Sequence, residues 1–263
     1  MIEAEGLVKR FKHVTAVDGL SFTARGGEVF GLLGPNGAGK TTTLRLLATV
    51  LEPTAGTARV AGYDIRADKQ KVREVLGLLV EDAGLYRKVS AREHLRYFGR
   101  LHGINGAALE RRIDALIDAL GMASFADRDT DGFSRGMKRR VVLGIALIHE
   151  PQVVILDEPT IGLDVVSTRA VRDLIARFRA EGRCVVISTH LMDEVERLCD
   201  RVAIIHGGRI MAQGAPAELT AQTGAPDLET AFVRVVGEDA LLEKGDPPQP
   251  GRLARLVRRV RRR

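Results

Sequence analysis

The sequence predicts an α/β fold with a mostly parallel core sheet, an N-terminal antiparallel β piece and an inserted helical subdomain. Three short, mostly apolar runs, as expected for parallel strands buried on both faces, lie at 29–33, 153–156 and 183–188. Each run is followed by a helix-like segment, which is typical of strand–helix alternation. The stretch from about 88 to 150, in contrast, is rich in helical periodicity.

The same patterns place the remaining elements in chain order. Antiparallel strand pieces are expected at 2–8, 15–22 and 58–60, and helices after the three buried strands at 41–47, 164–181 and 192–198. Apolar residues recur at helical spacing from Leu109 to Leu120, with glycines at 103, 106 and 121 as breaks. The predicted organisation is a core of residues 1–87 and 151–240, a helical insertion at 88–150, a Gly- and Pro-rich linker at 241–251 and an Arg-rich tail at 252–263.

Composition favours a cytoplasmic protein that does not bind nucleic acid. Seven arginines lie in 252–263, so the other 251 residues carry 33 basic and 34 acidic side chains, a net charge of −1. No apolar run approaches the roughly 18 residues of a spanning helix, and residues 1–5 lack the features of a signal peptide. Cys184 and Cys199 fit no metal spacing, which suits a reducing compartment.

A glycine-rich segment after the first buried strand predicts a phosphate-binding loop. Residues 34–41 read Gly-Pro-Asn-Gly-Ala-Gly-Lys-Thr, the pattern of a P-loop NTPase, where glycines let backbone N–H groups curl around phosphate oxygens. Lys40 is expected to reach the β- and γ-phosphates of ATP, and the Thr41 hydroxyl to ligate Mg²⁺. The alternative is a plain glycine-rich turn. The predicted nucleotide ligands are Asn36, Gly37, Ala38, Gly39, Lys40, Thr41 and Thr42.

The second buried strand ends in two carboxylates, Asp157 and Glu158. Asp157 is expected to hold Mg²⁺, largely through water, because Mg²⁺ commonly keeps part of its hydration shell. Glu158 is placed to orient or deprotonate an attacking water. Paired acids after a strand are otherwise common in loops, so this interpretation depends on the phosphate loop.

These segments resemble the ABC ATPase family, and the resemblance extends over about residues 2–235. Residues 133–140 resemble the family's signature segment, and a helix is expected to follow at 141–148. In the family this segment completes the ATP site of the opposite subunit, which implies that Ser134 and the Gly136 amide face a γ-phosphate across a dimer interface. A Ser before a helix is a ready anion site, but the plain alternative is an N-cap.

Further residues resemble family elements. Residues 161–164 resemble the D-loop, His190 the histidine that contacts the γ-phosphate, and Phe11 the aromatic on which adenine stacks. Without the resemblance, such a histidine is commonly incidental and such an aromatic commonly belongs to the core. The resemblance implies catalytic roles for Lys40, Glu158 and His190.

Four residues depart from the family pattern. Glu81 stands in place of the Q-loop glutamine; a carboxylate is able to ligate Mg²⁺ but does not donate as an amide does. Arg135 and Met137 replace a glycine and a glutamine of the signature, and Ile161 replaces a small polar residue of the D-loop. None of these removes a group needed for hydrolysis, so the site is expected to be competent.

Within the family, residues 84–86, 136–138 and 228–232 look most like the NatA and drug-exporter branch, the ABC-2 type. The resemblance implies an ATP-dependent homodimer that energises a separate transmembrane permease, for export of Na⁺ or drug-like cargo, from the inner face of the cell membrane. Two alternatives stay open. One is a soluble ABC ATPase that acts on ribosomes or DNA, although such proteins usually have two such domains or a long coiled coil. The other is a nucleotide-dependent regulator that hydrolyses little ATP.

The Arg-rich tail at 252–263 allows two interpretations. Leu253, Leu256, Val257 and Val260 share one face of a helix, as in a basic amphipathic helix lying on anionic lipid. The alternative is a disordered, solvated run of charge.

Overall fold

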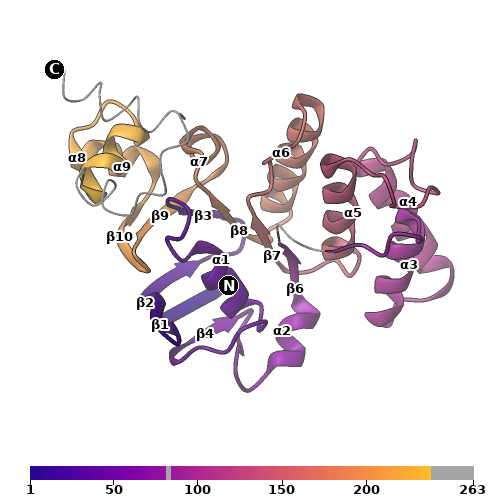
Figure 1. The fold of residues 1–263 in the computed structure, drawn as a ribbon, viewed down its shortest axis with the longest axis horizontal. Helices are drawn as coiled ribbons and strands as arrows, with labels where there is room; N and C mark the ends of the chain where they lie inside the picture. The colour runs from indigo at the N-terminus through magenta and orange to yellow at the C-terminus, as the bar shows by residue number, and fades with distance from the viewer. Residues whose placement is uncertain (81–83, 238–263) are drawn as a thin grey trace.

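The computed structural model describes residues 1–80 and 84–237. Glu81, the predicted linker at 241–251 and the Arg-rich tail therefore lie outside the described residues. No helix in the described ranges is long and apolar enough to cross a membrane. The described chain forms two sheets, a helical group and several covering helices (Figure 1).

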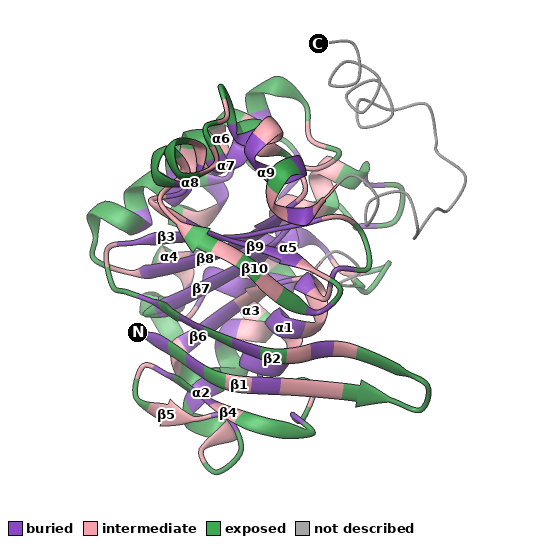
Figure 2. Ribbon diagram, turned by 90° about the vertical axis from the view of Figure 1, so that its left-hand side faces the viewer, coloured by how far each residue is buried: buried purple, intermediate pink, exposed green. Residues whose placement is uncertain are grey.

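The N-terminal β piece is an antiparallel sheet in the order β2-β1-β4-β5. It consists of β1 (Ile2–Phe11), β2 (Val14–Ala24), β4 (Ala55–Val60) and β5 (Tyr63–Asp64). Buried and exposed residues alternate along β1 and β2, because one face packs on the core and the other faces solvent. The β1–β2 hairpin is drawn with an exposed tip in Figure 2.

The second sheet has the order β10-β9-β3-β8-β7-β6 and is parallel except for the β9–β10 pair. Its strands are β3 (Val29–Leu33), β6 (Leu76–Leu79), β7 (Val153–Asp157), β8 (Cys184–Thr189), β9 (Arg201–His206) and β10 (Arg209–Gly214). Every residue of β3, β7 and β8 is buried, which explains their continuous apolar runs. The predicted P-loop α/β fold is confirmed by this sheet and by the structural comparisons reported below.

Alternate residues of these strands enter two separate cores. Phe30, Leu32 and Ile155 pack with the antiparallel sheet and α1 (Lys40–Leu47). Leu33, Leu156 and Ile187 pack with the opposite core, to which the helices below contribute. The parallel sheet is thus held rigidly from both sides, and its strand ends are correspondingly well placed to carry a site.

Three helices form the group at the right of Figure 1: α3 (Ala91–Leu101), α4 (Gly106–Ala119) and α5 (Arg135–Leu147). Ser90 begins α3 with a capping box, in which its hydroxyl accepts from the Glu93 N–H and the Glu93 carboxylate accepts from the Ser90 N–H. The sequence expectation of a helix at 141–148 is corrected here, because α5 begins at Arg135. Ser134 caps that earlier start, so the signature residues lie in the first turns of the helix.

The remaining helices cover the sheets. They are α2 (Lys69–Val75), α6 (Val165–Ala180), α7 (Met192–Leu198), α8 (Pro216–Thr223) and α9 (Leu228–Val236). The elements expected from the sequence do not include α2, α8, α9, β5, β6, β9 or β10. Of these, β9 has a buried apolar run at 202–205 like that of β7, which could have predicted it. The strand expected at 58–60 begins three residues earlier, at Ala55.

Candidate nucleotide-binding site

The predicted residues of the phosphate loop, Asp157, Glu158 and His190 meet because β3, β8 and β7 are neighbouring parallel strands. Their carboxyl ends lie at the same edge of the sheet, which is where open α/β sheets bind ligands. The phosphate loop follows β3, Asp157 ends β7, and His190 follows β8. Residues separated by more than a hundred positions in the chain are therefore brought into contact.

Glycines shape the loop between β3 and α1. A Cβ on Gly34 would lie 2.3 Å from the carbonyl oxygen of Ile205, and a Cβ on Gly39 would lie 2.4 Å from that of Ala16. Gly39 also has a φ of 104°, in the left-handed region that favours glycine. The first N–H groups of α1 have no partner within the helix, and with the dipole they favour an anion. The loop is therefore a backbone cradle of the kind that binds phosphate.

Lys40 is buried at the start of α1, with 6% of its surface exposed. Its ammonium group donates to the carbonyl oxygens of Gly34 at 2.7 Å and Pro35 at 3.2 Å, and lies 3.6 Å from Oε1 of Glu158. These partners hold a cation inside the loop, next to the carboxylate at the end of β7. An incoming phosphate would find a positive charge already in place there.

Asp157 accepts from two hydroxyl groups. Thr41 Oγ1 donates to its Oδ2 at 2.9 Å, and Ser188 Oγ donates to its Oδ1. Hydroxyl and carboxylate oxygens are the donor atoms that Mg²⁺ prefers, and their contact here fits a Mg²⁺ ion held by Thr41 and Asp157. No cluster of three or more His, Cys, Asp and Glu side chains suited to a metal occurs in the described ranges, and a Mg²⁺ completed by phosphate and water needs none.

Glu158 connects the phosphate-loop lysine, Lys40, to the residue that follows β8, His190. Its Oε1 lies 2.9 Å from Nδ1 of His190, whereas its Oε2 is buried and has no hydrogen-bond partner among the described residues. Its backbone has a φ of 49°, and its N–H donates to the Ser188 carbonyl at 3.0 Å. A buried carboxylate oxygen without a partner is costly, so it points to a group that arrives with the ligand, such as a water.

Sequence reasoning missed two residues here. Ser188 contacts both Asp157 and the Glu158 backbone, and Arg139 of α5 donates to the backbone after β7. Polar residues at the end of an apolar strand are the signal that could have found Ser188. No local sequence pattern predicts this role of Arg139, since its partners lie about twenty positions further along the chain.

Phe11 lies at the end of β1, opposite Val14 across the hairpin. Its side chain is 44% exposed, and the Lys9 ammonium lies 5.2 Å from the centre of its ring. Ala16, two residues beyond Val14, has its carbonyl oxygen against Gly39 of the phosphate loop. The hairpin therefore presents an aromatic face to solvent near the phosphate loop, in keeping with the predicted adenine contact.

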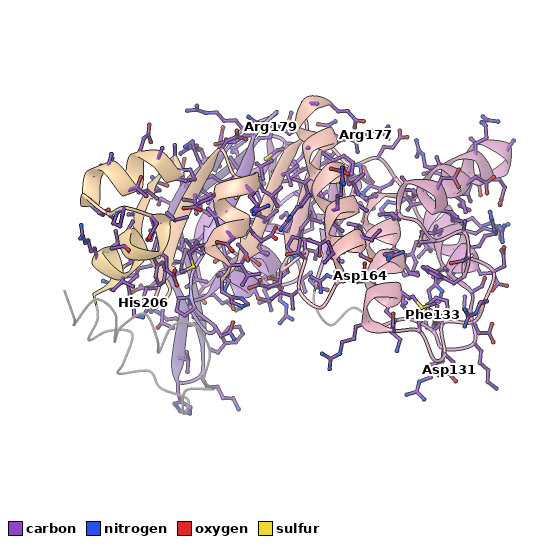
Figure 3. All side chains as sticks on the ribbon, turned by 90° about the horizontal axis from the view of Figure 1, so that it is seen from above. Asp131, Phe133, Asp164, Arg177, Arg179 and His206 are labelled. Atoms are coloured by element: carbon purple, nitrogen blue, oxygen red, sulfur yellow. The ribbon has the colours of Figure 1, made fainter. Side chains whose placement is uncertain are left out.

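Ser134 and Gly136 lie elsewhere. Ser134 is exposed and caps α5 by accepting from the Met137 N–H at 3.2 Å, while a Cβ on Gly136 would meet only Leu163 and Ser134 at 3.6 Å or more. Figure 3 separates Phe133, next to Ser134, from His206, next to the Ile205 carbonyl that touches the phosphate loop. Within one chain the signature residues do not join the P-loop.

Residues 161–164, likened to the D-loop, lead into α6. Asp164 caps this helix, accepting from the Ser167 N–H at 2.8 Å. Arg140 of α5 donates to Ser167 Oγ and lies 3.7 Å from Asp164. Glu81, the predicted third metal ligand, lies outside the described residues.

A family described as ABC transporter matches residues 17–161, more than half of the chain. The chain belongs to the ABC transporter family. It is 41% identical over 223 residues to the ATP-binding protein NatA of Bacillus subtilis (strain 168), which covers 84% of this chain and 91% of NatA. It is 39% identical over 224 residues to the daunorubicin/doxorubicin resistance ATP-binding protein DrrA of Streptomyces peucetius, covering 85% and 68% respectively.

Solved structures agree with the family. The structure of an ABC transporter ATP-binding subunit superposes with a TM-score of 0.84 at 29% identity, covering 90% of this chain and 100% of that one. A dimeric ATP-binding cassette in a post-hydrolysis state with ADP and Pi gives a TM-score of 0.74 at 21% identity, covering 82% and 98%; at that identity the likeness shows the fold alone. The chain is an ABC transporter ATP-binding subunit and an ATPase, and its resemblance to the NatA and drug-exporter branch is confirmed.

Proposed function

We propose that this ABC ATPase energises a separate membrane permease for export, with Na⁺ or a drug-like molecule as cargo. The names of its relatives support an export role, since DrrA is a drug-resistance protein and others are Nod factor export proteins. In this proposal the protein works at the cytoplasmic, inner face of the cell membrane and does not bind nucleic acid.

The observation that carries the proposed mechanism is the Glu158 carboxylate, whose Oε1 lies against Lys40 and His190 while its buried Oε2 has no partner among the described residues. Glu158 Oε2 accepts a hydrogen bond from the attacking water and orients it toward the γ-phosphate. His190 holds the carboxylate through Oε1, and Lys40 stabilises the charge that develops on the phosphate oxygens. Thr41 and Asp157 would hold Mg²⁺, which would supply charge neutralisation at the phosphates.

The adenine and the second half of the site complete the proposal. Phe11 stacks on adenine, and the amides and side chains of residues 36–42 surround the phosphates. Ser134 and the Gly136 amide of a second copy close the site over the γ-phosphate, since within one chain Phe133, next to Ser134, lies apart from His206, next to the Ile205 carbonyl at the phosphate loop (Figure 3). Hydrolysis removes the bridging phosphate and opens the dimer, a two-state element that ATP biases.

Two further proposals rest on the sequence alone: Glu81 as a metal ligand, and the basic tail 252–263 as a contact with anionic lipid. The role of the tail would be excluded if a chain ending at 250 co-sediments with anionic vesicles as well as the full chain does.

The test compares ATP turnover of the wild type with Glu158→Gln, together with size-exclusion chromatography in Mg-ATP. We expect turnover to fall at least 100-fold, since a positioned general base contributes about 10²–10⁴ in rate. ATP binding and the ATP-dependent dimer should persist, because the amide keeps the shape of the side chain. Glu5→Gln, at an exposed carboxylate on β1, is the matched control. A Glu158→Gln protein that hydrolyses ATP at the wild-type rate would refute the mechanism.

A further inference from the structure

Arg139 of α5 reaches across to the backbone that carries the catalytic carboxylate. Its Nη2 donates to the carbonyl oxygen of Asp157 at 2.6 Å and to that of Glu158, and its Nε donates to that of Pro159 at 3.2 Å. One guanidinium group thus binds three successive carbonyls, beginning with that of the last residue of β7. These contacts involve no side chain of the site, and the proposed mechanism gives Arg139 no part.

The turn that Arg139 holds has an unusual backbone. Glu158 adopts a φ of 49°, a left-handed conformation that costs a non-glycine residue on the order of 1 kcal/mol or more. The surrounding structure must impose such a conformation. On one side Ser188 does so, accepting from the Glu158 N–H with both its carbonyl oxygen at 3.0 Å and its hydroxyl at 3.3 Å. On the other side the Glu158 carbonyl is held by Arg139.

The direction of the Glu158 carboxylate follows from this backbone. Three carbonyl dipoles that converge on one point repel one another unless a cation lies between them. A planar guanidinium donates in several directions at once, which a lysine ammonium on a flexible stem does less well. With the turn held, Oε1 of Glu158 meets His190 at 2.9 Å and lies 3.6 Å from Lys40.

We propose that Arg139 is a positioning residue for hydrolysis, which holds the 157–159 backbone so that Glu158 is aimed at the attacking water. The inference rests on the proposed catalytic role of Glu158. It also ties α5 to that role, because Arg139 lies just over one turn from Ser134, the residue proposed to contact nucleotide bound to the second copy. Closure of the dimer onto Ser134 and the orientation of Glu158 in the same chain are then linked through one helix.

A residue that only anchored α5 would affect folding, so the test separates the two roles. Arg139→Gln is compared with Arg139→Lys and with Arg111→Gln, which removes the same charge from an exposed site on α4. For each variant, kcat and KM for ATP, the affinity for a fluorescent ATP analogue and the melting temperature are measured. Amide hydrogen exchange of the peptide covering 155–163 is measured without nucleotide.

We expect kcat of Arg139→Gln to fall roughly 100-fold, as a small misplacement of a reacting group costs about that much. KM and analogue affinity should stay within about threefold of the wild type, and Arg139→Lys should recover part of the lost rate. Exchange in 155–163 should become faster, and Arg111→Gln should behave as the wild type. Adding Glu158→Gln to Arg139→Gln should lower kcat little further, since both act through one group.

Two results would overturn the inference. One is a wild-type kcat and unchanged exchange in Arg139→Gln. The other is a parallel loss of melting temperature, analogue affinity and kcat that lysine does not relieve, which marks a purely structural anchor. If the wild type itself shows no turnover, the proposed function fails instead, and the exchange measurement alone then decides whether Arg139 holds the turn.

Discussion

The ends of β3, β7 and β8 and the start of α5 both carry predicted nucleotide contacts, yet they are built in opposite ways. At the strand ends Lys40, Asp157 and Glu158 are buried; Lys40 lies against Glu158, and Asp157 accepts from the hydroxyl groups of Thr41 and Ser188. At the start of α5, Ser134 is exposed and its hydroxyl caps its own helix. The comparison teaches that one chain by itself assembles the groups proposed to hydrolyse ATP, whereas the proposed closure of the site needs a second surface.

The largest effect is expected from Lys40→Met at the buried end. The methionine fills a similar volume but removes the charge that meets the phosphates, so we expect turnover to fall by about 10³-fold or more. The affinity of the single chain for an ATP analogue should fall as well, because the contact lies within one chain. Titration with a fluorescent analogue and steady-state turnover measure the two effects. Unchanged analogue affinity would show that Lys40 is not a ground-state contact.

A smaller effect is expected from Ser134→Ala, and it should fall on turnover and the dimer rather than on nucleotide binding by the single chain. We expect turnover and the ATP-dependent dimer to weaken by about 10- to 100-fold, which corresponds to the loss of one or two hydrogen bonds to a charged group. Analogue binding by the single chain should stay as in the wild type. Size-exclusion chromatography with ATP over a range of protein concentrations measures the dimer.

Loss of the α5 cap is a confounding effect in that variant, worth about 1 kcal/mol of stability. Ser134→Thr is the control, because threonine keeps a hydroxyl for both roles. If Ser134→Ala lowers analogue binding at a concentration where the chain is monomeric, the proposal that Ser134 acts only across the dimer is wrong.

The smallest effect concerns stability at the base of the helical group. His102 and His149 stack there with ring centres 3.9 Å apart, and His149 lies 3.1 Å from the Leu76 carbonyl. Burial lowers the pKa of His149 from 6.5 to about 4, with the nearby His102 adding to this, and burial lowers the pKa of His102 as well. The unfolded chain therefore binds the proton first, so this stability is present above about pH 6.5 and is lost as the pH falls toward 4.

We expect His149→Gln to remove part of this acid sensitivity. The difference in unfolding free energy between pH 7 and pH 5 should shrink by about 1 kcal/mol, allowing for the partial exposure of the ring. Urea unfolding at the two pH values measures it, with His13→Gln at an exposed position as the control. Equal acid sensitivity in the wild type and His149→Gln would contradict the low pKa.

The sequence by itself determined the fold class, the family and the residues of the phosphate loop and the β7 carboxylates. Local patterns indicate these features: glycines where a Cβ would collide, continuous apolar runs for strands buried on both faces, and carboxylates where such a strand ends. Backbone requirements of this kind fall on consecutive residues, so they can be recognised without knowledge of the fold. The same holds for the Ser134 cap, although the start of α5 was placed six residues too late.

Only the tertiary structure decided which side chains meet. The strand order β3-β8-β7 brings Ser188 to Asp157 and His190 to Glu158 across about thirty residues of chain. The left-handed φ of Glu158 and its hold by Arg139 depend on how α5 packs against the end of β7. Such contacts are non-local, and they arise from crossover connections and core packing, for which no short stretch of sequence carries a signal.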